Sequence, residues 1–192
     1  MSDFWLYLKL GLHHVLDWQA YDHILFLIVL VAAYTFDSWK RIFILVSLFT
    51  VGHTLSLLLA SYNVVSFSST WIEFLIPITI LVAAVYNLVT SKKRRHSKSL
   101  GLFYVITIFF GLIHGFGFAS YFKIINDDGA ILPLLEFALG IELAQLIVVL
   151  LVLVMSFVFQ RIFRFKKRDW VLVVSAIVIG MVIPMLQRNW PF

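Results

Sequence analysis

The sequence contains no cysteine, so it can form neither a disulfide bond nor a thiolate site for a metal. Charged residues are also scarce, because they make up 13% of the 192 residues while 62% are hydrophobic. Soluble domains carry about 25% charged residues on surfaces that face water. The composition therefore excludes a soluble globular protein and predicts a single integral membrane domain over residues 1–192.

Two further absences restrict the function. The N-terminus lacks a basic segment and a small-residue cleavage site, so we expect no cleavable signal peptide. The chain also has no glycine-rich phosphate-binding loop of the kind that ATP-driven enzymes use. Without cysteine, a metal site must draw on His, Asp, Glu, Met or backbone atoms, and such ligands suit borderline to hard divalent ions.

Long apolar runs separated by short polar connections make up most of the chain. A helix needs about 20 apolar residues to cross the hydrocarbon core of a membrane. We expect an all-α bundle of six transmembrane helices, over roughly 22–37, 41–61, 70–90, 100–121, 132–160 and 170–187. Residues 4–17 are too few for a full span, so they predict a half-inserted or interfacial helix before the bundle.

The basic residues indicate the orientation of the bundle. Of the 15 lysine and arginine residues, all but three lie in alternate connections at 40–41, 92–98 and 161–168. The positive-inside rule places these connections in the cytoplasm, so six spans leave both termini outside. We expect the basic loops to face the anionic headgroups of the lipid bilayer, and we expect no nucleic-acid partner despite the net charge of +5.

Ionisable residues inside the apolar runs are costly in hydrocarbon and therefore indicate function. Counted from the outer ends of their spans, His53, His114 and Glu142 lie roughly 10–15 Å deep at 1.5 Å per residue. Nearer the outer surface the chain carries further candidate ligands, which are His13, His14, Asp17, Asp22, His23 and Glu73. Five of the six histidines thus lie on one side of the membrane.

His114 lies in Phe110–Ala119, an apolar run without charge that contains three glycines. Gly111 and Gly115 form a small-xxx-small pair, which packs membrane helices closely. An unpaired polar group in hydrocarbon costs several kcal/mol. We therefore expect His114 to face polar partners on neighbouring helices.

Two or three imidazoles with carboxylates form a site for Ni²⁺, Zn²⁺, Co²⁺ or Fe²⁺, and affinity alone does not select among them. The leading hypothesis is passive cation uptake, driven by about 2.3 kcal/mol per charge per 100 mV of inside-negative potential. One alternative is a metal-dependent intramembrane hydrolase that opens to the outer leaflet. Another is the metal-binding subunit of a larger complex. The inner half of the bundle is poor in ligands, which counts against transport.

Five ordered segments resemble the motifs of the HupE/UreJ family, whose members are bacterial inner-membrane proteins associated with nickel supply to hydrogenase and urease. These segments are Gly11–Leu16, Tyr21–Leu27, Phe49–Leu57, Gly111–Ala119 and Phe137–Gln145. Two details depart from the family pattern. The turn of residues 17–21 is longer than expected, and Thr54 stands where serine is more usual.

The resemblance implies a nickel-like divalent-cation permease of the bacterial inner membrane, a transporter rather than an enzyme; the basic loops place its termini in the periplasm. It implies a metal site of His14, Asp22, His23, His53, His114 and Glu142, and the residues themselves add His13, Asp17 and Glu73 as secondary candidates. Ni²⁺ is the ion that the resemblance favours, ahead of Zn²⁺, Co²⁺ and Fe²⁺. It leaves open whether the chain forms a homo-oligomer or joins a membrane complex.

Overall fold

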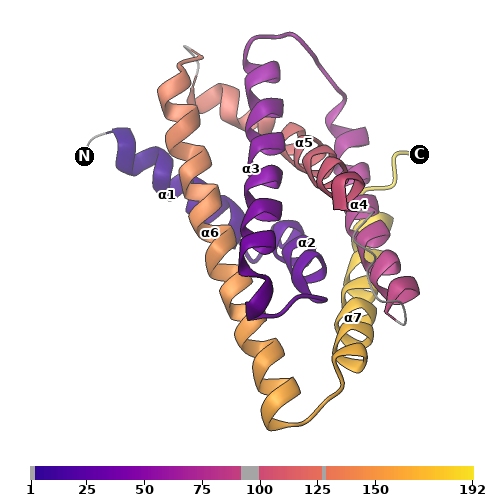
Figure 1. Ribbon diagram of the computed structural model, residues 1–192. Coiled ribbons are helices and arrows are strands. Elements are labelled where there is room, and N and C mark those ends of the chain that lie inside the picture. Colours follow the sequence, from indigo (N-terminus) through magenta and orange to yellow (C-terminus); the bar gives the residue numbers. More distant parts are fainter. Residues whose placement is uncertain (1–2, 92–99, 127–128) are drawn as a thin grey trace.

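The computed structural model describes residues 3–91, 100–126 and 129–192, and every regular element in these ranges is a helix. Five helices there are long and apolar enough to cross a membrane, namely α3 (Trp39–Ser61), α4 (Ser69–Thr90), α5 (Leu100–Ile125), α6 (Ile131–Phe157) and α7 (Lys167–Arg188). Two shorter helices, α1 (Asp3–Leu16) and α2 (Asp22–Val31), precede them (Figure 1). The predicted helical membrane bundle is confirmed. The basic connection expected at 92–98 lies outside the described residues.

The expected count of six full spans is not exact. α2 contains ten residues and ends at Val31, although a span over 22–37 was predicted. Ten helical residues rise about 15 Å, which is half of the hydrocarbon core. The chain leaves the helix through Ala32, Ala33 and Tyr34, and a short 3₁₀ turn, η1 (Phe36–Ser38), leads into α3. Because residues 32–34 are uncharged and largely apolar, hydropathy does not distinguish them from a continued helix.

Each of the other predicted spans overlaps one of the five long helices. α6 continues past Phe157 as a π-helical turn, η3 (Val158–Ile162), before the chain reverses into α7. The short helix α1 matches the segment predicted as half-inserted. In Figure 1 both termini lie in the upper half of the view, opposite the connection between α6 and α7 at the bottom.

The short helix α2 lies inside the bundle. It contacts α4, α6 and α7, and its N-terminus meets the C-terminal end of α1 (Figure 1). Seven of its ten residues are buried, and apart from Asp22 and His23 the helix is wholly apolar. A helix that is hydrophobic on every face is stable only when it is surrounded. α1 and α2 therefore form a broken pair whose junction lies in the protein interior.

Contact between backbones joins α1 to α6. A Cβ atom on Gly11 would collide with the carbonyl oxygen of Phe137, and one on Gly140 would collide with that of Leu8. Small residues let membrane helices approach this closely. Because Gly11 lies one turn before His14, the contact also sets the position of that imidazole.

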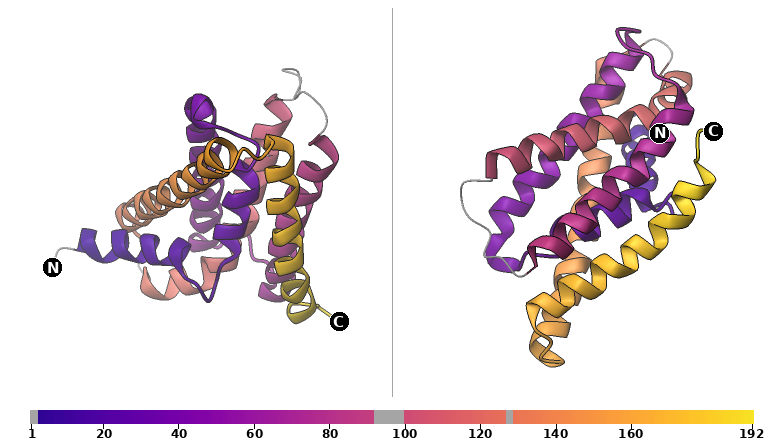
Figure 2. Two further views of the ribbon diagram at one scale, coloured as in Figure 1. Left: turned by 90° about the horizontal axis from the view of Figure 1, so that it is seen from below. Right: turned by 90° about the vertical axis from the view of Figure 1, so that its right-hand side faces the viewer.

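A second crossing of the same kind joins α3 to α5, and the right-hand view of Figure 2 shows the two helices crossing obliquely. A Cβ atom on Gly52 would collide with the carbonyl oxygen of Ile108, and one on Gly111 would collide with that of Phe49. This confirms the close packing predicted from the glycines of α5. His53 follows Gly52 directly, so the crossing determines where its ring lies.

Large apolar side chains cover the outer faces of the long helices, as lipid contact requires. Exposed tryptophans lie at both ends of the bundle. Trp39 begins α3 at the basic end, while Trp71 in the first turn of α4 and Trp190 beyond α7 lie at the other. Aromatic residues at both levels are typical of the two membrane–water interfaces.

Replacing Gly52 by alanine is expected to destabilise the bundle by about 1–3 kcal/mol, because the new methyl group must push two backbones apart. The melting temperature of the detergent-purified variant measures this loss. Gly180→Ala in α7 is the matched control, since a Cβ atom there meets nothing within 4 Å. A Gly52→Ala variant with the same melting temperature as the wild type would contradict the close crossing of α3 and α5.

Candidate metal site

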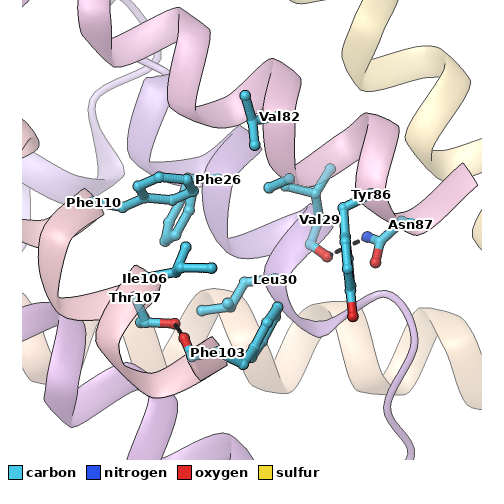
Figure 3. A pocket seen from close by; sticks show the side chains of 11 residues that line it. Phe26, Val29, Leu30, Val82, Tyr86, Asn87, Phe103, Ile106, Thr107 and Phe110 are labelled. Atoms are coloured by element: carbon cyan, nitrogen blue, oxygen red, sulfur yellow. Dashed lines mark hydrogen bonds between the residues drawn. The ribbon is translucent and has the colours of Figure 1, made fainter. Parts of the chain in front are cut away.

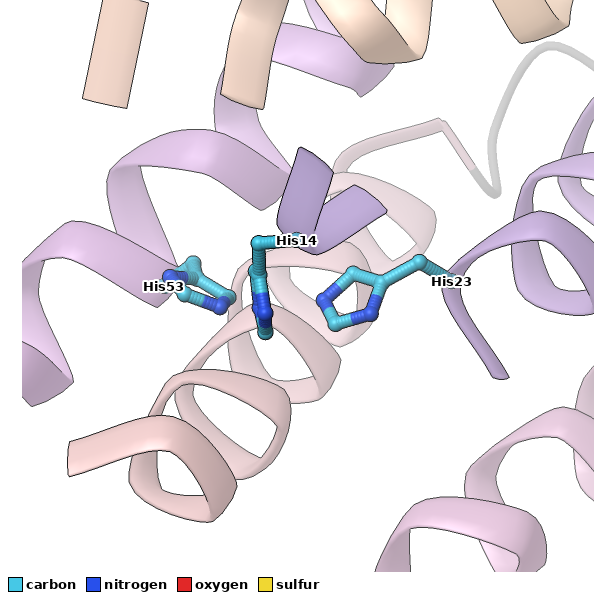
Figure 4. A group of neighbouring side chains, drawn as sticks. All are labelled: His14, His23 and His53. Atoms are coloured by element: carbon cyan, nitrogen blue, oxygen red, sulfur yellow. The ribbon is translucent and has the colours of Figure 1, made fainter. Parts of the chain in front are cut away.

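Three histidines from different helices converge where α1 meets α2. His14, His23 and His53 each offer one ring nitrogen, and these three atoms lie within 4.8 Å of one another. The ring centroid of His14 lies 4.6 Å from that of His23 and 5.4 Å from that of His53. Figure 4 shows His14 between the other two rings. This spacing lets three imidazoles reach a common ion with small side-chain movements.

A second group overlaps the first. Asp22, His23 and His114 also offer three ligand atoms that lie within 4.8 Å of one another. The ring centroids of His23 and His114 are 5.1 Å apart. Because His23 belongs to both groups, four imidazoles and one carboxylate form a continuous cluster, which we call the histidine cluster. Its members come from α1, α2, α3 and α5.

A hydrogen bond orients His23 for coordination. Its Nδ1 lies 3.1 Å from Oδ1 of Asp22, and an ionised carboxylate can only accept, so Nδ1–H donates. In the neutral ring the lone pair is then on Nε2, which is buried and has no protein partner. Metal-binding histidines are commonly held by a carboxylate in this way.

A different partner orients His114. The hydroxyl of Thr79 donates its one proton to the carbonyl oxygen of Ile76 at 2.7 Å. Its oxygen must therefore accept from Nε2–H of His114, 3.1 Å away. The lone pair of the neutral ring is then on Nδ1, which is buried without a protein partner. Thr79 had no signal in the sequence, because it is an isolated threonine in an apolar helix.

Unsatisfied nitrogen atoms concentrate in the histidine cluster. In the described part of the chain, ten buried side-chain polar atoms have no hydrogen-bond partner, and five of them are ring nitrogens of these four histidines. Both nitrogens of His53, which is fully buried, are among them. Each such atom costs about 1–3 kcal/mol. A cation that accepts the lone pairs would remove much of this cost, so the residues fit a bound metal.

Aromatic rings enclose the histidine cluster. The ring of His14 lies 4.0 Å from that of Phe118, and the ring of His114 lies 5.2 Å from that of Phe49. Phe26 stacks on Phe49 at 4.8 Å. These side chains offer no hydrogen bonds, so they exclude water from the ring nitrogens and lower the local dielectric.

An apolar cavity of about 80 Å³ lies beyond the histidine cluster, between α2, α4 and α5 (Figure 3). Phe26 and Phe110 line it, and the ring of Phe26 lies 5.4 Å from that of His114. Asn87 also lines it and donates its amide to the carbonyl oxygen of Val29 at 2.6 Å. Its described lining has no carboxylate or imidazole, so the cluster ends at this layer of phenylalanines.

Glu142 lies outside the histidine cluster. Ser47 donates to its Oε1 at 2.7 Å, and the hydroxyl of Thr50 contacts its Oε2. The same hydroxyl lies 3.2 Å from Oε1 of Gln145. The structure thus places Glu142 in a separate polar group between α3 and α6. Thr50 had a partial signal in the sequence, because it precedes His53 by one turn on the same face.

The secondary candidates lie at the surface. His13, Asp17 and Glu73 are exposed, and none belongs to either group of ligand atoms. Asp17 instead accepts a hydrogen bond from the backbone N–H of Gln19 at 2.8 Å, which stabilises the turn after α1. His13 and His14 are adjacent in sequence, and the helix turns only His14 inward.

A family model described as "HupE / UreJ protein" matches residues 1–189, nearly the whole chain. The chain belongs to the HupE/UreJ family. The match includes all five segments on which the resemblance rested, and it extends beyond them to α7. HupE/UreJ proteins form a membrane protein family associated with nickel/cobalt transport. Neither the comparison with curated proteins nor that with solved structures gave a match.

Replacing Thr79 by the nearly isosteric valine is expected to weaken binding of Ni²⁺ about 10- to 100-fold, because His114 loses the partner that fixes its tautomer. Isothermal titration of the purified protein measures the affinity. Thr107→Val is the control, since Thr107 is also buried and its hydroxyl donates within its own helix, to the carbonyl oxygen of Phe103. Equal affinities in the two variants would refute the role of Thr79.

Proposed function

We propose that this HupE/UreJ protein is a permease for a divalent transition-metal cation, with Ni²⁺ as the leading ion, in the bacterial inner membrane. The observation that carries the proposal is the histidine cluster, in which four inward-facing imidazoles share unsatisfied ring nitrogens. Borderline divalent ions prefer such neutral nitrogen ligands. The association of the family with nickel/cobalt transport supports the same class of substrate.

The proposed orientation places the histidine cluster in the outer half of the membrane. α3 begins beside Lys40 and Arg41, and the connection from α6 to α7 is also basic, so these ends face the cytoplasm. His53 lies nearer the opposite end of α3. The broken pair of α1 and α2 then crosses the membrane once, which keeps both termini in the periplasm. Discontinuous helices of this kind form ion sites in many transporters.

The overlap of the two ligand groups suggests how an ion advances. A cation held by His14, His23 and His53 can stay bound to His23 while the other two histidines are replaced as ligands. Asp22 and His114 take their places. Because one ligand is kept throughout, the ion is never fully released into an apolar interior. The membrane potential contributes about 2.3 kcal/mol per charge per 100 mV, so a divalent ion gains about twice that.

Glu142 is the next candidate ligand for the ion on its way toward the cytoplasm. Its hydrogen-bond donors Thr50 and Ser47 precede His53 by three and six residues on α3. At 1.5 Å per residue they lie roughly 5–9 Å closer to the cytoplasmic end. A carboxylate at this depth attracts a cation that leaves the imidazoles. We therefore assign Glu142 to passage of the ion rather than to its first binding.

His14→Ala is expected to lower Ni²⁺ entry into protein-loaded vesicles at least tenfold, because it removes one ligand of the outer group. His13→Ala, its sequence neighbour, is the matched control and should keep entry within about twofold, since that ring is exposed. Metal analysis of both purified variants records whether binding is lost with transport. Stoichiometric binding by the wild type without entry would contradict a permease and favour a catalytic or storage role.

Glu142→Gln is expected to separate binding from transport. The amide keeps the size of the side chain; its single oxygen accepts from one of the two hydroxyls, Ser47 or Thr50, and its NH₂ group faces the other, but it lacks the negative charge. Affinity for Ni²⁺ should stay within about threefold of wild type, while the rate of entry falls at least fivefold. A large loss of affinity would instead place Glu142 among the ligands of the bound ion.

A further inference from the structure

A cavity of about 390 Å³ opens at the basic end of the bundle. It lies where the end of α4 meets the beginnings of α3 and α7, on the opposite side of the phenylalanine layer from the histidine cluster. Sites for small molecules in proteins typically enclose about 300–1,000 Å³. The cavity is therefore large enough for a ligand much bigger than a single water molecule.

Positive charge dominates the lining of this cavity. Arg41, Lys167 and Arg168 line it, and its described lining contains no aspartate or glutamate. The nearby carboxylate of Asp37 lies instead in a separate cavity with Arg161. The guanidinium groups of Arg41 and Arg168 give this space a positive potential, which attracts an anion.

The neutral part of the lining also suits an anion. Ser38 contributes a hydroxyl group to the lining, whereas the hydroxyls of Thr90 and Ser91 donate within their own helix. Lys167 is the first residue of α7, so this helix begins at the cavity, whereas α3 continues from the turn η1. The positive ends of helices carry free backbone N–H groups, which favour phosphate.

We propose that this cavity binds a phosphate-bearing anion, which is supplied either by the headgroup of a cytoplasmic-leaflet lipid or by a soluble phosphate compound. Arginine and lysine between transmembrane helices at the cytoplasmic face provide this chemistry for anionic lipid headgroups. Arginine adds paired hydrogen bonds to two phosphate oxygens. The cavity binds an anion through positive side chains, so it is distinct from the histidine cluster, whose ring nitrogens and carboxylate bind a cation.

A bound anion at this location would also affect the exit of a cation, and this step alone rests on the proposed permease function. Asn87 lines both the basic cavity and the apolar cavity that reaches Phe26 below the histidine cluster. A divalent cation that leaves by this route would meet the charges of Arg41, Lys167 and Arg168. A bound phosphate group would offset them and lower the barrier to exit.

The test measures binding of three compounds to the purified full-length protein by isothermal titration. They are short-chain phosphatidylglycerol, short-chain phosphatidylcholine and inorganic phosphate. A triple variant, Arg41→Gln with Lys167→Gln and Arg168→Gln, removes the cations of the cavity. A control triple, Arg161→Gln with Arg164→Gln and Lys166→Gln, removes as many charges from the same end without touching the cavity lining.

The wild type is expected to bind phosphatidylglycerol or inorganic phosphate more tightly than the zwitterionic phosphatidylcholine. Each basic residue contributes about fivefold to the affinity for an anion, so the cavity triple should bind the preferred anion about 100-fold more weakly than the wild type. The affinity of the control triple should stay within about threefold of wild type. Preference for phosphatidylglycerol assigns the site to a lipid headgroup, and preference for inorganic phosphate assigns it to a soluble compound. Binding is read without metal or transport, so failure of the permease proposal would leave this result unaffected.

Two outcomes would overturn the proposal. One is the absence of binding by either anion, and the other is an equal loss in both triple variants, which would indicate a diffuse basic surface. Thermal unfolding followed by tryptophan fluorescence shows whether each variant is folded. If the cavity triple does not fold, the single variant Arg168→Gln at an exposed position replaces it, with an expected loss of about fivefold.

Discussion

Imidazole nitrogens that no protein group satisfies, held in an apolar interior, are the constraint on which the bundle depends. Such atoms are costly, and only a rigid fold keeps them together in an apolar interior. Rigidity comes from the two glycine crossings, in which backbone meets backbone without intervening side chains. Each crossing lies within one turn of a histidine, so the packing of the helices also fixes the positions of the rings.

The break between α1 and α2 serves the same site. A continuous helix would turn His14 and His23 to positions set by its own period. The break at residues 17–21 lets the two rings meet at 4.6 Å, although they lie nine positions apart in sequence. The Asp22 carboxylate at the start of α2 then orients His23, which links the turn to the chemistry.

The bundle thus has two polar regions of opposite character. At the α1–α2 junction, ring nitrogens and one carboxylate converge in an arrangement that suits a cation. At the basic end, a cavity is lined by Arg41, Lys167 and Arg168. Phe26 and its neighbours separate them. Glu142 lies to one side, between α3 and α6, where hydroxyls of α3 contact it.

The sequence by itself determined the membrane class and the approximate helix ranges, and it indicated the residue types of the candidate metal site, because hydropathy and the cost of buried charge are local properties. It also indicated His53, His114 and the Asp22–His23 pair as candidates. It did not reveal that α2 stops at Val31, because an apolar turn has the same hydropathy as a helix. Only the tertiary structure decided that His14 rather than His13 faces inward, that Thr79 orients His114, and that Glu142 lies apart. These outcomes depend on how helices distant in sequence cross, and the crossings are set by backbone contacts that no single segment specifies.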